Sequence, residues 1–139
     1  RFSNKTAIAP TASISIICGG TSPGVEPIAA NSFTHKTLSG SFNVRNRYLE
    51  KILAKYNKND DETWSSITTN QGSVSHLDFL TQQEKDVFKT AFELDQKWIV
   101  ELGADRTPNV SQAQSINIFV PADIHKKELH QIHFQAWKK

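Results

Sequence analysis

The stretch from Ala7 to Ser15 (AIAPTASIS) contains the residues whose types and spacing could bind a charged ligand. Pro10 favours extended backbone before it, and Thr11 or Ser13 can then cap a short helix. A helix start exposes backbone N–H groups and about half a positive charge. The hydroxyl groups add donors, and the small Ala12 lets an anion, best of all phosphate, approach the backbone. Hydroxyl-rich helix starts also commonly cap only themselves, so these residues alone leave both a phosphate site and simple capping open.

Other reactive side chains give weaker patterns. The single cysteine, Cys18, cannot close an internal disulfide, and we expect it to be a small buried hydrophobic residue. His125, His130 and His133 cluster near the C-terminal end, but a metal site needs further ligands. We therefore expect surface or packing histidines and no metal site. Glu26 is expected to be either a structural carboxylate or one that supports the candidate site from behind, hydrogen-bonded near the hydroxyl-rich stretch.

Composition excludes several classes of protein. The chain has 139 residues, 37% of them hydrophobic and 22% charged, which is ordinary for a folded domain. No stretch approaches the roughly 20 apolar residues that span a bilayer. The net charge of +2 is small and the lysines are scattered, which argues against direct nucleic-acid binding. Without a secretory signal pattern, and with one cysteine, a cytoplasmic location is expected.

Helical spacing predicts three longer helices. The first covers Arg45 to Tyr56 and is followed by a polar loop that includes Asp60, Asp61 and Glu62. The second covers Thr81 to Leu102 and begins with a capping box, Thr81 with Glu84. The third begins near Asp123. Its expected inner face carries Leu129, Ile132, Ala136 and Trp137.

A β-branched run, Ser115 to Val120, predicts a short strand that ends at Pro121. A second extended segment is expected before Pro10. Isolated strands are unstable without a sheet. These two segments therefore need partners that the chain does not obviously supply.

Four blocks of sequence resemble ribonucleotide reductase large subunits. The stretch from Ala7 to Ser15, with GGTSPGVEP at Gly19 to Pro27, resembles the loop that binds the substrate's phosphates in that family. NSFTHKTLSGSF at Asn31 to Phe42, SQAQSINIF at Ser111 to Phe119 and HFQAWKK at His133 to Lys139 follow in the family's order. The details look most like the class I, diphosphate-reducing enzymes, particularly phage-type ones.

The resemblance implies a fold and a domain organisation. The fold would be α/β and helix-rich, an incomplete sector of the family's ten-stranded α/β barrel. Residues 1–139 would form a single segment of that catalytic domain. Within it, residues 1–30 would be the phosphate-binding loop and helix, 31–110 a helical region, and 111–139 a barrel strand with its following helix. Because the chain has no methionine, we expect Arg1 not to be a natural start, so the chain would be an engineered piece, a processed product or one part of a split protein.

The resemblance also assigns site residues and partners. Thr11, Ala12, Ser13 and Ile14 would hold the substrate's diphosphate, mostly through backbone N–H groups, and Ser15 would be a weaker member. None of the motifs that carry the family's radical-forming and reducing cysteines is present, so we expect no catalytic residue here and no activity from the chain alone. The partners would be the remaining segments of the large subunit, a ribonucleoside diphosphate, and a separate small subunit whose cofactor generates the radical. No cofactor would bind this chain.

Two other readings stay open. The chain could be a non-catalytic assembly module derived from a reductase, without phosphate affinity. It could also belong to a cobalamin-dependent (class II) reductase, although that class usually carries glycine where Ala12 stands.

Overall fold

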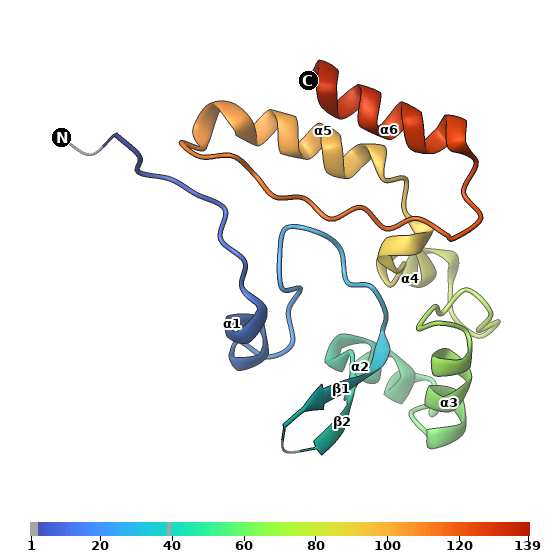
Figure 1. Ribbon diagram of the computed structural model, residues 1–139. Helices are drawn as coiled ribbons and strands as arrows, with labels where there is room; N and C mark the ends of the chain where they lie inside the picture. Colours follow the sequence, from blue (N-terminus) through green and yellow to red (C-terminus); the bar gives the residue numbers. More distant parts are fainter. Residues whose placement is uncertain (1–2, 39) are drawn as a thin grey trace. The chain divides into compact units, whose positions relative to one another are not determined.

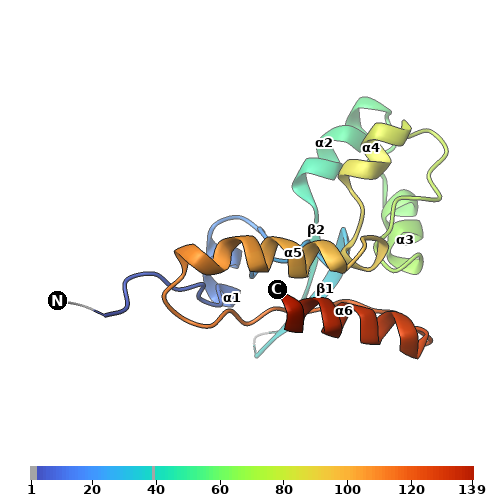
Figure 2. The same cartoon turned by 90° about the horizontal axis from the view of Figure 1, so that it is seen from above.

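The computed structural model describes residues 3–38 and 40–139. The chain divides into two compact units (Figures 1 and 2). One unit is Ile28–Glu93, and the other combines Arg1–Pro27 with Leu94–Lys139. The expected division at residues 30 and 110 refers to a complete barrel and stays a prediction.

The unit Ile28–Glu93 contains a β-hairpin and short helices. Its strands are β1 (Ser32–Thr37) and β2 (Gly40–Arg45), which pair antiparallel with Ser32 opposite Arg45. Its helices are α2 (Arg47–Lys55), α3 (Asp61–Thr69), α4 (Gln82–Val87) and the 3-10 turn η1 (Ala91–Glu93). The sequence predicted α2 but neither the hairpin nor α3.

Capping explains where α2 and α3 begin. The Asn46 side chain accepts a hydrogen bond from the N–H of Tyr48 (3.0 Å), and the Asp60 side chain accepts one from the N–H of Thr63 (2.7 Å). Caps of this kind satisfy N–H groups that a helix start leaves without partners. The expectation of a loop through Asp61 and Glu62 was therefore wrong, because Asp60 starts a helix there.

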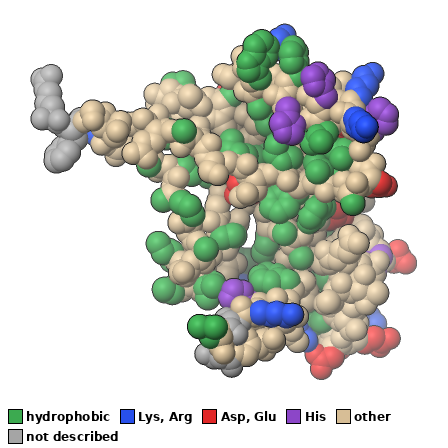
Figure 3. Space-filling model, in the orientation of Figure 1, with side chains coloured by type: hydrophobic (Ala, Val, Ile, Leu, Met, Phe, Trp, Pro, Cys, Tyr) green, Lys and Arg blue, Asp and Glu red, His purple; other side chains and the backbone are tan. Residues whose placement is uncertain are grey.

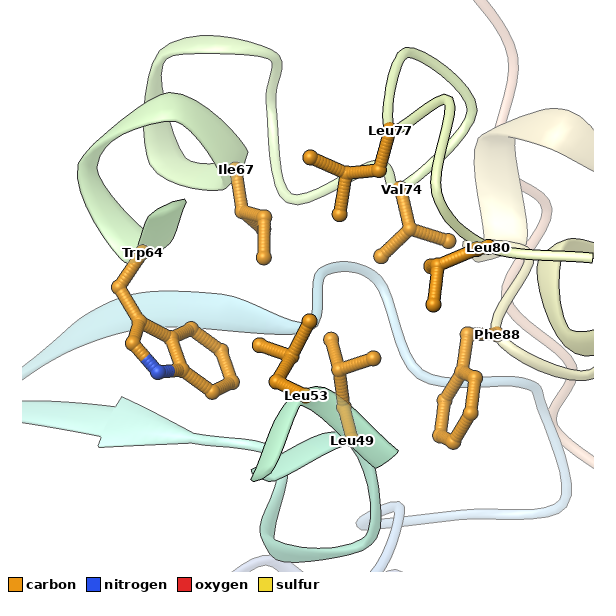
Figure 4. Close-up of a cluster of buried hydrophobic side chains, with 8 residues drawn as sticks. All are labelled: Leu49, Leu53, Trp64, Ile67, Val74, Leu77, Leu80 and Phe88. Carbon is orange, nitrogen blue, oxygen red and sulfur yellow. The ribbon is translucent and has the colours of Figure 1, made fainter. Parts of the chain in front are cut away.

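One hydrophobic core holds this unit together (Figure 4). Side chains from α2 and α3 face side chains from the loop that leads to α4, and Phe88 closes the cluster. The cluster consists of Leu49, Leu53, Trp64, Ile67, Val74, Leu77, Leu80 and Phe88. Removal of this apolar surface from water is the main stabilising term for the unit.

The long helix predicted from Thr81 to Leu102 is interrupted. The predicted capping box is confirmed, but α4 ends at Val87 and the next α-helix begins only at Lys97. Between them, Thr90 and Ala91 are buried, and the N–H of Ala91 donates to the carbonyl oxygen of Ile28 (2.9 Å). These tertiary contacts draw the backbone out of the helical path that the side-chain spacing favours.

The second unit is built from α1 (Ala12–Ile17), α5 (Lys97–Arg106), the 3-10 turn η2 (Thr107–Asn109) and α6 (Lys126–Lys138). Helices α5 and α6 lie side by side in both views (Figures 1 and 2). Ile132 is buried on α6, whereas Trp137, expected on the inner face, is 78% exposed. Helix α6 begins after His125, whose Nδ1 accepts the N–H of Lys127, and not after Asp123.

Among the described residues, Ser115–Val120 belongs to no strand; it is a segment without regular secondary structure that returns toward α6 (Figure 1). The N–H of Asn117 donates to Glu26 Oε1 (2.7 Å) and the N–H of Phe119 donates to Gln96 Oε1 (2.8 Å). Side chains thus accept from alternate N–H groups, which is the spacing that an edge of a β-ladder uses. The strand predicted here has no partner strand in the described part of the chain.

Candidate phosphate-binding loop at the start of α1

Helix α1 begins without a side-chain cap. Thr11 occupies the N-cap position with φ −120° and ψ 31°, and its side chain makes no capping hydrogen bond. The first-turn N–H groups of a helix have no acceptor inside the helix. Within the described residues, no acceptor lies on the N–H groups of Ala12, Ser13 or Ile14. Three neighbouring donors are therefore free to bind an anion.

The five residues predicted for this site differ in availability. Ala12, Ser13 and Ile14 are exposed, Thr11 is half-buried and Ser15 is buried. The N–H of Thr11 donates to the carbonyl oxygen of Pro23 (3.0 Å), so only its hydroxyl remains. Ser15 uses its N–H on the Thr11 carbonyl (2.7 Å) and its hydroxyl on the Ala12 carbonyl (2.8 Å). Serine in a helix commonly bonds back to its own backbone, which the sequence pattern does not reveal.

The segment around α1 carries no charged side chain. The chain contains no lysine, arginine, aspartate or glutamate between Thr6 and Val25, and the first turn of α1 has no acidic residue. The partial positive charge at the helix start is therefore not neutralised within its own segment. An anion placed there meets donors and a favourable field, and no carboxylate on α1 itself competes with it.

Two glycines with positive φ end α1, as the sequence predicted. Gly19 has φ 93° and Gly20 has φ 76°, and the N–H of Gly20 donates to the carbonyl oxygen of Ser15 (3.0 Å). Left-handed backbone of this kind terminates helices at little cost when glycine supplies it. The chain then turns back, so that Pro23 reaches Thr11.

Most of the apolar surface of α1 is exposed. Ile14 is 57% exposed and Ile17 is 85% exposed, and only Ser15 is buried on this helix. Figure 3 shows hydrophobic side chains on the surface in the region of α1. Cys18 is exposed as well, so the expectation of a buried cysteine was wrong for this chain. Little of the described structure packs over α1.

Other candidate sites are less developed. Two hollows of about 390 and 230 Å³ lie against α5, and none of the residues from Thr11 to Ser15 lines them. In residues 3–38 and 40–139, no group of three or more His, Cys, Asp or Glu side chains is arranged to hold a metal ion. The search of these same residues for a long apolar helix that could cross a membrane found none.

Comparison with known proteins gives one consistent result. The family model described as "Ribonucleotide reductase, barrel domain" matches residues 1–139. The ribonucleoside-diphosphate reductase large subunit of Invertebrate iridescent virus 6 is 54% identical over 142 residues, covering 99% of this chain and 15% of the viral protein. The ribonucleoside-diphosphate reductase large chain 2 of Saccharomyces cerevisiae is 36% identical over 139 residues, covering 100% of this chain and 16% of the yeast protein.

A solved structure agrees with these relatives. The Actinobacillus ureae class Id ribonucleotide reductase alpha subunit superposes with a TM-score of 0.84 and 38% sequence identity, covering 97% of this chain and 24% of that one. The chain therefore spans about a quarter or less of the length of the relatives described here.

Proposed function

The chain belongs to the ribonucleotide reductase family, as a sector of its α/β barrel domain, and from this premise we propose that it binds the diphosphate of a ribonucleoside diphosphate at the start of α1. The observation that carries the proposal is that the N–H groups of Ala12, Ser13 and Ile14 have no acceptor among the described residues. Helix starts with free N–H groups bind phosphate in many unrelated proteins.

Each residue of the site has a distinct role in this proposal. The N–H groups of Ala12, Ser13 and Ile14 donate to phosphate oxygens, and the hydroxyl groups of Thr11 and Ser13 add donors. Ala12 carries only a methyl group, so an oxygen can reach the backbone. Ser15 supports the helix turn through its bond to the Ala12 carbonyl and is the weakest member of the set. The loop takes no part in breaking or forming the bonds of the reaction. It positions the substrate for chemistry that is carried out elsewhere.

The proposed reaction is the radical-based reduction of ribonucleoside diphosphates to deoxyribonucleotides by the complete large subunit. The relatives are named ribonucleoside-diphosphate reductases, and the solved structure is a class I subunit, which supports the diphosphate reading over the cobalamin-dependent one. The proposed partners are the remaining segments of the large subunit and a small subunit that generates the radical. We place the protein in the cytoplasm, the host's where the gene is viral.

Amide chemical shifts test the binding proposal directly. Inorganic pyrophosphate and then cytidine diphosphate would be titrated into the ¹⁵N-labelled chain. The amides of Ala12, Ser13 and Ile14 should shift together and saturate. The amide of Thr63 serves as an internal control, because the Asp60 carboxylate already occupies that helix start.

The same titration distinguishes the alternative function. A reductase-derived assembly module without phosphate affinity would leave the α1 amides unmoved up to millimolar pyrophosphate. Uniform small shifts across both helix starts would indicate ionic strength rather than binding, and would also count against the proposal.

A further inference from the structure

The loop that carries α1 is tied at both ends to one downstream segment. Before the loop, the Thr6 hydroxyl donates to the Asn109 carbonyl (2.9 Å), and the N–H of Ser111 donates to the Thr6 carbonyl (3.0 Å). After it, Glu26 Oε1 accepts both the N–H (2.7 Å) and the Nδ2 (3.2 Å) of Asn117. All five residues belong to the same compact unit.

In the second tie the Glu26 carboxylate is buried, whereas its partner Asn117 is exposed. Glu26 is only 8% exposed, although its side chain is a carboxylate. Within residues 3–38 and 40–139 no lysine or arginine forms an ion pair with it, and the two Asn117 donors satisfy one of its oxygens. Its other oxygen packs onto the turn, where a Cβ on Gly24 would overlap it. A buried carboxylate is costly unless hydrogen bonds compensate it, so this arrangement needs both partners in place.

A short path of hydrogen bonds leads from Glu26 to the start of α1. The Ser22 hydroxyl donates to the Glu26 carbonyl (2.6 Å) and closes the turn. Pro23, inside that turn, accepts the N–H of Thr11 (3.0 Å), which is the residue immediately before α1. A shift of the Glu26 carboxylate would therefore move the turn and, through Pro23 and Thr11, the start of α1.

Helix α5 and its N-cap residue Gln96 hold the segment that contains Asn117, the partner of Glu26. The N–H of Phe119 donates to Gln96 Oε1 (2.8 Å), and Gln114 Nε2 donates to the Gly103 carbonyl (2.8 Å). These contacts lie on either side of Asn117 in the sequence. The segment is held against a helix before and after the residue that holds Glu26.

We propose that Glu26 is a positioning residue for the anion site: through Asn117 it locks the turn whose carbonyl holds Thr11, and so it keeps the free N–H groups of α1 aimed at one point. The proposal rests on the proposed function only in that the anion is the substrate's diphosphate. Donors that are already ordered bind an anion without a further cost in conformational entropy. The contact between Glu26 and Asn117 would raise the affinity by keeping the donors ordered in this way.

The experiment combines pyrophosphate titration with hydrogen exchange at the Thr11 amide, using the full chain. In Glu26→Ala, the dissociation constant for pyrophosphate should rise about tenfold, and Thr11 exchange should accelerate by a similar factor. Glu26→Gln keeps an oxygen acceptor without the charge and should stay within about threefold of the parent. Asp123→Ala removes an exposed carboxylate from the same unit and should change neither quantity.

Several results would overturn the inference. One is that Glu26→Ala binds pyrophosphate with the affinity of the parent. Another is that Glu26→Gln loses as much affinity as Glu26→Ala, because the effect would then come from the charge of Glu26 and not from its hydrogen bonds. If Glu26→Ala fails to fold, Asn117→Ala decides, because it removes only the 3.2 Å bond and should weaken binding about threefold. If pyrophosphate does not bind the parent chain, the proposed function fails, and Thr11 exchange alone then decides whether Glu26 locks the turn.

Discussion

Asn46 Nδ2 donates a hydrogen bond to Asn31 Oδ1 over 2.9 Å, and the N–H of Asn46 donates to the Asn31 carbonyl over the same distance. The pair joins the residue before β1 to the residue that caps α2. Asn31 is 1% exposed, and its Nδ2 also donates to the carbonyl oxygens of Gly72 (3.0 Å) and Phe88 (2.7 Å). One buried amide thus connects the hairpin, α2, the turn after α3 and the end of α4.

Asn31→Ala should destabilise the chain by about 3 kcal/mol, because it leaves buried polar groups without partners. Urea unfolding of the chain measures the change. It is followed by the fluorescence of Trp64, which lies in the unit Ile28–Glu93. Asn43→Ala, an exposed asparagine on β2, should cost no more than about 0.5 kcal/mol. Equal losses in the two variants would contradict the role assigned to Asn31.

Gly72 should tolerate no side chain. Its φ is +80°, and a Cβ there would lie 2.7 Å from Ala30 Cα and 2.9 Å from the Asn31 nitrogen. Gly72→Ala should therefore cost about 3 kcal/mol or more, from the clash and the left-handed backbone together. Gly20→Ala is the matched control, since Gly20 has φ +76° with open space around it and should show only the backbone cost of about 1 kcal/mol. Urea midpoints of the two variants give the comparison, and a smaller loss at Gly72 would be the contrary result.

The capping box of α4 should make stability depend on pH. The N–H of Thr81, then its hydroxyl, hold the pKa of the Glu84 carboxyl below its ordinary value of 4.5, and the Tyr56 hydroxyl contributes in the same direction. A carboxyl with a lowered folded-state pKa stabilises fully above its unfolded pKa and loses that contribution as pH falls through its folded pKa. The parent should therefore exceed Glu84→Gln in stability at neutral pH and lose this advantage as the pH falls below 4.5. Unfolding free energies at a series of pH values test this, and a constant difference would exclude it.

The local signals in the sequence predicted local structure well. Pro10, Thr11 and the pair Gly19–Gly20 gave the position of α1, and Thr81 with Glu84 gave the start of α4. Each of these signals acts within one helical turn, so no distant contact can override it easily.

Structure that depends on distant partners was not predictable in the same way. Strand β2 alternates polar residues with apolar Phe42 and Val44, but it is short and almost entirely exposed, so no buried face distinguishes it from a loop. The helix predicted through Thr90 is interrupted because Ala91 pairs with Ile28, far away in sequence. At the candidate site, the sequence indicated which residues could donate hydrogen bonds to an anion, but it did not indicate which of their N–H groups are free. Which N–H groups are free depends on Pro23 accepting from Thr11.

Ser13→Asp should abolish phosphate binding at α1 without destabilising the helix. An aspartate in the first turn of a helix interacts favourably with the N–H groups and with the dipole, by about 0.3–1 kcal/mol. The same carboxylate occupies the space proposed for the diphosphate and repels it. Stability and anion affinity should consequently move in opposite directions.

Ser13→Asn supplies the matched control, since it has nearly the shape of aspartate but no charge. Pyrophosphate should shift the Ala12 and Ile14 amides in Ser13→Asn with an affinity within about threefold of the parent, and should leave them unmoved in Ser13→Asp. Thermal unfolding should show Ser13→Asp at least as stable as Ser13→Asn. If both variants bind pyrophosphate equally, the anion does not lie at the start of α1, and the donors on Ala12, Ser13 and Ile14 must serve another purpose.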